Sequence, residues 1–186
     1  MTGLAMYFRK IVGKRCYLSP IDARDAEKYA GWLNDREVAE GVNDYARMMS
    51  RESMDGVLGG LSKSHNYAIV DIGANELIGS CGYVKLDHLN RAGEVFVFIG
   101  DKNYWGKGYG TEALGLLMDF GFRALNLHSI WLMVYSFNGR AIKAYEKIGF
   151  KVIGRRREAK LRNGEWHDNI YMDILRGDFY ARYDPA

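Results

Sequence analysis

The stretch that decides the fold is Glu94-Val-Phe-Val-Phe-Ile99, which five residues separate from Trp105-Gly-Lys-Gly-Tyr-Gly-Thr111. The five consecutive apolar residues of the first segment indicate a central strand that is buried on both faces. Residues 112–125, which follow the second segment, have a helical pattern that is apolar nearly all round, and this predicts a buried helix. The chain therefore passes from a buried strand to a buried helix through a turn that contains three alternating glycines.

This glycine turn is open to two interpretations. A strand-to-helix turn exposes unpaired backbone N–H groups at the positive end of a helix, and glycines let a phosphate approach them closely. Lys107 adds positive charge. The alternative is a tight turn that needs positive φ at several positions. We favour a ligand that carries a pyrophosphate, because three glycines cost backbone entropy.

The spacing of the turn narrows the choice of nucleotide. The pattern GxxxxGK[ST] of the phosphate-binding loop is absent from the chain. A dinucleotide-binding GxGxxG follows the first strand of a βαβ unit, whereas this GxGxG follows a strand that has three earlier strands before it. Coenzyme A also carries a pyrophosphate and fits the turn better.

Outward from this centre, the sequence predicts the element order β-α-α-β-β-β-α-β-α-β-β, which is a mixed α/β sheet. Strands are expected over residues 16–19, 67–71, 77–86, 94–99, 129–135, 152–162 and 165–175. Helices are expected after the cap Asp22, over 48–61, over 112–125, and from the cap Asn138 to Gly149. Residues 34–45 predict a loop or a short broken helix, and Asn163-Gly164 predicts a tight hairpin.

The composition is that of a globular protein. The chain has 186 residues, of which 48% are hydrophobic and 26% charged, and we expect one domain over 1–186 with residues 1–13 as an N-terminal extension. No apolar run reaches the roughly 18 residues of a membrane helix, and no signal peptide is recognisable, so a cytoplasmic location is expected. The net charge of +3 is too small to imply a nucleic-acid or membrane partner.

The cysteines and histidines show no metal pattern. Cys16 and Cys81 stand 65 residues apart, and we expect two buried free thiols. No set of histidines, cysteines and carboxylates has the spacing of metal ligands, so no metal is expected. His65, His88, His128 and His167 are scattered, and structural roles are favoured for all four.

Two motifs carry a resemblance to a known family. Trp105-Gly106-Lys107-Gly108-Tyr109-Gly110 resembles the cofactor motif Gln/Arg-x-x-Gly-x-Gly/Ala of the GNAT superfamily of N-acetyltransferases, with Trp105 in place of Gln or Arg. Asn138-Gly-Arg-Ala-Ile-Lys-Ala-Tyr145-Glu-Lys-Ile-Gly-Phe150 is similar to N-x-x-A-x-x-x-Y-E-K-x-G-F, the signature of the branch that acetylates ribosomal-protein N-termini, polyamines and antibiotics. Residues 166–172 also resemble that branch, and the resemblance runs from about Arg15 to Leu175.

The resemblance implies a fold and a cosubstrate. The fold is a mixed, mostly antiparallel twisted sheet of about seven strands with four helices, in which the fourth strand (94–99) and the fifth (129–135) splay apart. Acetyl-CoA is the implied cosubstrate, with its pantetheine arm between these strands. The implied cofactor-binding residues are Phe98, Ile99 and Gly100 on the fourth strand, the backbone of Trp105, Gly106, Lys107, Gly108, Tyr109, Gly110 and Thr111 for the pyrophosphate, and Asn138 near the arm.

Two residues are candidates for proton transfer. From its pattern alone Tyr145 is a packed core tyrosine, but the resemblance implies that it is the general acid that protonates the departing thiolate. Glu94 begins an apolar strand, so desolvation should raise the pKa of its carboxyl and suit it to act as a base, directly or through water. A glutamate at a solvent-exposed strand end is an equally weighted alternative. Because no nucleophile motif such as GxSxG appears, we expect direct attack by the amine.

The acceptor is left open by the sequence. It is a primary amine in a protein N-terminus, polyamine, amino sugar or antibiotic, and residues 34–61 with the last hairpin should shape its site. Arg155-Arg156-Arg157, with Lys160 and Arg162, favours a solvated strand face over attraction to RNA, an acidic protein or the 3′-phosphate of coenzyme A.

Two other functions are weighed against the enzyme. One is an inactive acyl-CoA sensor or scaffold, against which Asn138 and Tyr145 argue. The other is a modifier recruited to the ribosome by the arginine run, which is the indirect way in which nucleic acid could become a partner. The oligomeric state is open, a homodimer included.

Overall fold

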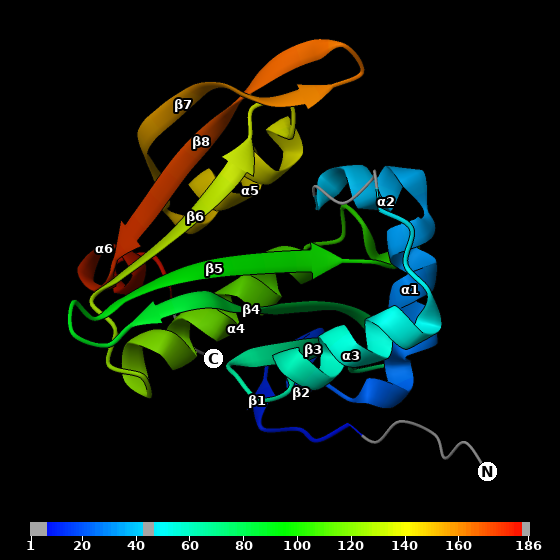
Figure 1. Cartoon of the computed structure of the whole chain (residues 1–186). Coiled ribbons are helices and arrows are strands. Elements are labelled where there is room, and N and C mark those ends of the chain that lie inside the picture. The colour runs from blue at the N-terminus through cyan, green and yellow to red at the C-terminus, as the bar shows by residue number, and fades with distance from the viewer. Residues whose placement is uncertain (1–6, 43–46, 184–186) are drawn as a thin grey trace. The chain divides into compact units, whose positions relative to one another are not determined.

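The computed structural model describes residues 7–42 and 47–183, and Figure 1 shows the course of the chain. The strands are Ile11–Val12 (β1), Cys16–Pro20 (β2), Asn66–Asp71 (β3), Leu77–Asp87 (β4), Ala92–Ile99 (β5), Ser129–Tyr135 (β6), Lys151–Arg162 (β7) and Glu165–Leu175 (β8). The α-helices are Ala26–Asn34 (α1), Arg36–Gly41 (α2), Arg51–Leu61 (α3), Tyr109–Arg123 (α4), Gly139–Ile148 (α5) and Arg176–Tyr180 (α6). Two 3₁₀ helices are Ala23–Asp25 (η1) and Lys102–Tyr104 (η2).

The strands form one open sheet in the order β1-β2-β3-β4-β5-β6-β8-β7. The pairs β2–β3, β3–β4, β6–β8 and β7–β8 are antiparallel, and the pair β5–β6 is parallel. The β5–β6 ladder joins only residues 92–94 to residues 129–131. A ladder this short agrees with the predicted splay of these two strands.

The predicted fold class is confirmed, with two differences in the number of elements. The described residues hold eight strands instead of about seven, because β1 has two residues and is too short to show alternation. They hold six α-helices instead of four, because α2 forms within the polar segment 34–45 and α6 follows the last strand. Residues 43–45 of that segment, and residues 1–6 of the predicted extension, lie outside the described residues.

The chain divides into two compact units, and unit 1 lies within residues 7–83 and 97–117. Its apolar core joins α1, α2 and α3 to one face of β2, β3 and β4. The core contains Tyr17, Ile21, Ala26, Tyr29, Ala30, Val38, Met49, Met54, Leu58, Ala68, Val70, Leu77 and Phe98. The predicted cap Asp22 accepts a hydrogen bond from the amide of Arg24 and starts η1, which runs into α1.

The prediction that β5 is buried on both faces is wrong. Val95 and Phe98 are buried, but Phe96, Val97 and Ile99 are half-buried. In unit 1 the reason lies at Gly110, in the first turn of α4. A Cβ at Gly110 would lie 3.5 Å from Ile99 Cγ1 and 3.9 Å from Val97 Cγ2, so glycine leaves these two side chains partly uncovered.

Unit 2 lies within residues 84–96 and 118–183 and contains the β6-β8-β7 part of the sheet. The predicted hairpin is confirmed: Asn163 and Gly164 have φ of +51° and +83°, as a type I′ turn requires. The ring of Phe179 from α6 lies 5.3 Å from that of Phe122. No helix in the described parts of the chain is both long and apolar enough to cross a membrane.

Candidate active site

The glycine turn connects η2 to α4, and its three glycines do not share one backbone conformation. Gly106 and Gly108 have φ of +71° and +86°, a region that residues with side chains rarely adopt. Gly110 is helical and has no such requirement. Turn geometry therefore explains Gly106 and Gly108 without a ligand, but it does not explain Gly110.

The start of α4 offers backbone donors. The amide of Glu112 donates to the carbonyl of Gly108 at 3.0 Å, in the i to i−4 pattern of an α-helix. The amides of Tyr109, Gly110 and Thr111 precede this bond, so the helix itself supplies no acceptor for them. They lie at the positive end of a 15-residue helix, a suitable place for an anion.

Trp105, which departs from the cofactor motif, has a structural role. Its indole Nε1 donates to the carbonyl oxygen of Ile99 at 2.7 Å, and its backbone amide donates to Lys102 at 3.1 Å. The ring also packs against the core of unit 1. Trp105 thereby fixes the beginning of the glycine turn to the end of β5.

Sequence reasoning missed Arg15 and Glu112, which lie beside the glycine turn. One oxygen of Glu112 accepts from the amides of Arg15 and Cys16 at 2.7 and 3.2 Å, and the other lies 3.4 Å from Arg15 Nη1. The same Nη1 is 3.5 Å from the position that a Cβ would take at Gly108. Arg15 therefore places a second positive charge beside the glycine turn, in addition to that of Lys107. No local signal indicates this contact, because Arg15 and Glu112 are 97 residues apart.

The three strand residues predicted to bind the pantetheine arm have their own partners. The Gly100 amide donates to the carbonyl of Ile78 at 2.9 Å, and a Cβ at Gly100 would lie 2.1 Å from the ring of Trp32. The ring of Phe98 lies edge-on to the same indole at a centroid distance of 5.9 Å. The carbonyl oxygen of Ile99 accepts a hydrogen bond from Trp105, and its second lone pair is not used by that bond. Packing alone therefore accounts for glycine at position 100.

Asn138 and Tyr145 lie at the two ends of α5 in unit 2. The side chain of Asn138 accepts from the amide of Ala141 at 3.1 Å, which confirms the predicted helix cap. Its amide nitrogen carries two donors that this bond does not use. The ring of Tyr145 is half-buried and 5.9 Å from that of Phe150, and burial raises the pKa of its hydroxyl to about 12. At neutral pH this phenol carries its proton.

Glu94 also lies in unit 2, on β5 opposite Trp131 of β6. Its side chain is half-buried, and burial raises the pKa of its carboxyl above the ordinary value, while Lys85 lowers it. The direction is the predicted one, although the strand around Glu94 is less buried than expected. A carboxylate with a raised pKa is a stronger base than an exposed one.

The predicted site residues thus fall into two groups. Unit 1 holds the strand residues 98–100 and the glycine turn 105–111, and unit 2 holds Glu94, Asn138 and Tyr145. The predicted free thiols are confirmed, because Cys16 and Cys81 are buried and form no disulfide. Across the residues that the structure describes, no three His, Cys, Asp or Glu side chains are placed to hold a metal ion.

Comparisons with known proteins agree with this architecture. A model of the acetyltransferase (GNAT) domain matches residues 15–151. The chain is 35% identical over 108 residues to spermidine N(1)-acetyltransferase of Escherichia coli K12, a match that covers 58% of either protein.

Solved structures show the same fold. Spermidine N-acetyltransferase from Vibrio cholerae, in complex with CoA and spermine, is similar with a TM-score of 0.80 at 22% identity, covering 89% of this chain and 98% of that one. RimL, a ribosomal L7/L12 alpha-N-protein acetyltransferase in complex with CoA, is similar with a TM-score of 0.76 at 16% identity, covering 88% and 96%.

Proposed function

The chain belongs to the acetyltransferase (GNAT) domain family, and we propose that it moves the acetyl group of acetyl-CoA directly to a primary amine in a ternary complex. The observation that carries this proposal is the family match over residues 15–151, which spans both the glycine turn and the helix of Tyr145. The acceptor is a small-molecule amine or a protein N-terminus. No covalent acyl-enzyme is part of the reaction.

The glycine turn is the proposed binding site of the pyrophosphate. The amides of Tyr109, Gly110 and Thr111 are donors at the positive end of α4, and Gly106 and Gly108 keep the preceding backbone free of side chains. The positively charged side chains of Lys107 and Arg15 would also attract the pyrophosphate. Phe98, Ile99 and Gly100 would flank the pantetheine arm, with the half-buried side chain of Ile99 as an apolar surface, and Asn138 would donate to the arm from α5.

Tyr145 and Glu94 are the proposed acid and base. With its pKa raised to about 12, Tyr145 keeps its proton at neutral pH and can give it to the departing thiolate of coenzyme A. Glu94 takes a proton from the acceptor ammonium, directly or through water, so that the free amine can attack the thioester. Backbone N–H groups of β5 would stabilise the oxyanion that forms.

The test is a panel of amines incubated with the full chain and acetyl-CoA, in which release of free thiol is followed. Spermidine, an amino sugar and peptides with free N-termini make up the panel, and N-acetylated peptides are the control. We expect thiol release that depends on a free amine. Binding of acetyl-CoA without release by any amine would instead indicate an acyl-CoA sensor and contradict the proposed reaction.

A further inference from the structure

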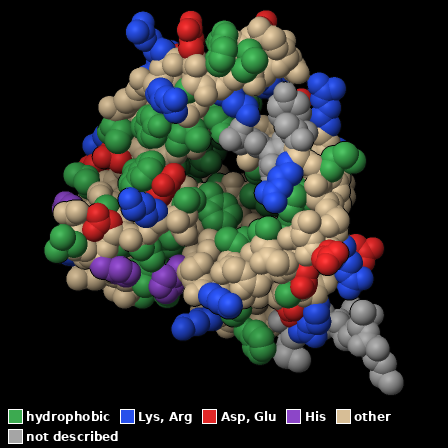
Figure 2. All heavy atoms as spheres, in the orientation of Figure 1, with side chains coloured by type: hydrophobic (Ala, Val, Ile, Leu, Met, Phe, Trp, Pro, Cys, Tyr) green, Lys and Arg blue, Asp and Glu red, His purple; other side chains and the backbone are tan. Residues whose placement is uncertain are grey.

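The positive charge of this chain is not gathered in one patch on the face that Figure 2 shows. The net charge is only +3, and Lys and Arg side chains are spread among Asp and Glu ones on that face. General attraction therefore contributes little to the binding of an anionic cosubstrate. What matters is whether a single cation is held at the place where the anion binds.

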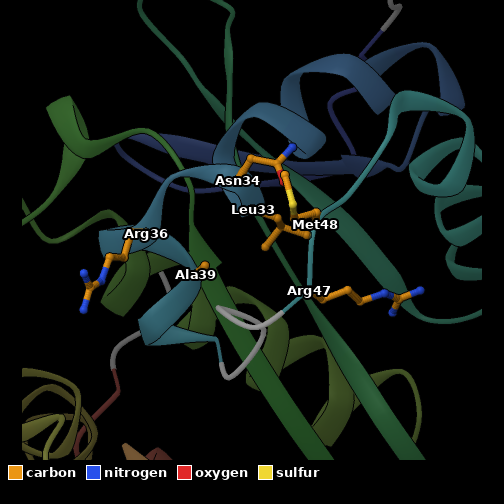
Figure 3. A pocket seen from close by; sticks show the side chains of 6 residues that line it. All are labelled: Leu33, Asn34, Arg36, Ala39, Arg47 and Met48. Carbon is orange, nitrogen blue, oxygen red and sulfur yellow. The ribbon is translucent and has the colours of Figure 1, made fainter. Parts of the chain in front are cut away.

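A pocket of about 460 Å³ in unit 1 has two arginines at its edges, which Figure 3 shows extending to opposite sides. Its lining residues are Leu33, Asn34, Arg36, Ala39, Arg47 and Met48. Arg36 Nε lies 3.1 Å from Glu40 Oε1, so a carboxylate already pairs with one of the two guanidinium groups. The pocket therefore gives no reason to expect an anion there.

Arg15, also in unit 1, differs because both of its main-chain groups are held by other elements. Its amide donates to Glu112 Oε1 at 2.7 Å, and its carbonyl accepts from the amide of Ile72 at 2.8 Å. Glu112 lies in the first turn of α4, and Ile72 follows β3. The main chain of Arg15 is thus fixed relative to the start of α4. Its side chain is 56% exposed and reaches the Glu112 carboxylate only at 3.4 Å, so the guanidinium is held loosely.

The carboxylate of Glu112 is enclosed by the turn that it holds. Glu112 Oε1 also accepts from the amide of Cys16 at 3.2 Å, and the amide of Gly13 donates to the carbonyl of Cys16 at 2.9 Å, which closes the turn between β1 and β2. A Cβ at Gly13 would collide with Glu112 Oε1. Glycine at position 13 therefore leaves room for this carboxylate, whose side chain is only 16% exposed.

A second hydrogen bond ties the same end of α4 to β3. The hydroxyl of Tyr109 donates to Asp71 Oδ1 at 2.7 Å, and Asp71 Oδ2 accepts from the amide of Ala74 at 2.6 Å. Asp71 is also the partner of Cys16 in the β2–β3 ladder. The first turn of α4 and the turn before β2 are therefore fixed to the same strand end, which keeps Arg15 beside the glycine turn.

We propose that Glu112 is a positioning residue for acetyl-CoA, which holds the main chain of Arg15 so that the guanidinium binds the diphosphate. The inference rests on the proposed function and adds to it the residue that keeps Arg15 in place. Arg15 Nη1 already lies 3.5 Å from the position of a Cβ at Gly108. A hydrogen bond from arginine to phosphate is charge-assisted, and a main chain that is ordered before binding loses less freedom when the bond forms.

The charge of Glu112 acts in the opposite direction to its hydrogen bonds. A carboxylate beside a diphosphate repels it, whereas the bonds to the amides of Arg15 and Cys16 hold the guanidinium where it can attract the diphosphate. If Glu112 acts by positioning, its oxygen atoms are needed for binding and its negative charge is not. The two contributions can therefore be separated by substitution.

The first experiment measures the Kd of acetyl-CoA and of acetyl-3′-dephospho-CoA by calorimetric titration at one salt concentration. Arg15→Gln should raise both values by about tenfold, because both ligands contain the diphosphate, and should leave kcat at saturating acetyl-CoA unchanged. The control is Arg123→Gln in the last turn of α4, where an arginine of similar exposure is paired with Asp119. It should change neither Kd.

Two substitutions at Glu112 then separate its hydrogen bonds from its charge. Glu112→Gln keeps an oxygen for the amides of Arg15 and Cys16, so the Kd of acetyl-CoA should stay at or below the wild-type value. Glu112→Ala removes this acceptor and should raise that Kd about fivefold. In the Arg15→Gln background Glu112→Ala should have little further effect, because positioning acts through Arg15. Thermal denaturation of each variant measures stability separately.

Three results would overturn the inference. An unchanged Kd of acetyl-CoA in Arg15→Gln removes Arg15 from the site. An effect of Arg15→Gln that disappears with acetyl-3′-dephospho-CoA assigns the guanidinium to the 3′-phosphate. An effect of Glu112→Ala that is equally large with and without Arg15 shows that Glu112 supports the turn as a whole. All three leave the proposed function standing, which fails instead if the wild-type protein binds no acetyl-CoA.

Discussion

The indole nitrogen of Trp105 and the carbonyl oxygen of Ile99 form a 2.7 Å hydrogen bond that ties the glycine turn to the end of β5. In Trp105→Phe this bond is lost while most of the ring packing remains. We expect a loss of about 1 kcal/mol in the free energy of unfolding and weaker binding of acetyl-CoA, with kcat at saturation unchanged. Chemical denaturation and calorimetric titration measure the two effects. The control Trp166→Phe, at an exposed position of β8, should change neither.

Two glycine-to-alanine substitutions in the turn distinguish a requirement of the backbone conformation from a requirement of ligand binding. Gly108→Ala places a side chain at φ +86° and should cost about 1–2 kcal/mol of stability. Gly110→Ala is helical and should maintain or raise the melting temperature. Its methyl group would nevertheless stand over Val97 and Ile99, and we propose that Ile99 flanks the pantetheine arm, so the Kd for acetyl-CoA should rise about tenfold. Unchanged affinity in Gly110→Ala would argue that glycine at this position does not make room for the pantetheine arm.

Tyr145→Phe tests the proposed acid. The ring and its contact with Phe150 are preserved, so folding and acetyl-CoA affinity should be close to those of the wild type. Turnover should fall by about 100-fold or more, because the thiolate would leave without a proton donor. Pre-steady-state measurement of thiol release reports the chemical step. A turnover equal to that of the wild type would leave Tyr145 with a packing role alone.

The pH dependence of kcat/KM tests Glu94. The base must be ionised, so the rate should fall as the pH drops through the raised pKa of this carboxyl. Lys85 lowers that pKa, and Lys85→Gln should therefore shift the acidic limb of the profile to higher pH. Lys63→Gln, at an exposed lysine in the turn before β3, is the control. An acidic limb that is the same in wild type and Lys85→Gln, or that persists in Glu94→Gln, would assign the base to another group.

Local chemistry is what made much of the fold predictable. Asn138 and Gly149 mark the ends of α5 because a cap and a left-handed residue act within one helical turn, and Gly149 has φ +119°. Asn163 and Gly164 specify their hairpin in the same way. Such signals depend only on neighbours in sequence, so they can be recognised without knowledge of the tertiary structure.

What could not be predicted depends on contacts between distant residues. Glu112 reads as an ordinary first-turn glutamate, yet it holds the backbone of Arg15 and Cys16 from 97 and 96 residues away. Gly100 was predicted to be a ligand contact, which no finding here tests, but its neighbours in sequence do not indicate that the ring of Trp32 occupies the space of its side chain. An apolar run in β5 indicated full burial, although glycine at the start of α4 leaves Val97 and Ile99 partly exposed.

The most direct test of the account is a crystal structure of the full chain with coenzyme A. We predict that pyrophosphate oxygens lie about 2.7–3.2 Å from backbone nitrogens between Trp105 and Thr111, with the guanidinium of Arg15 facing the same group. Coenzyme A bound with its pyrophosphate elsewhere, and these amides facing solvent, would contradict the account.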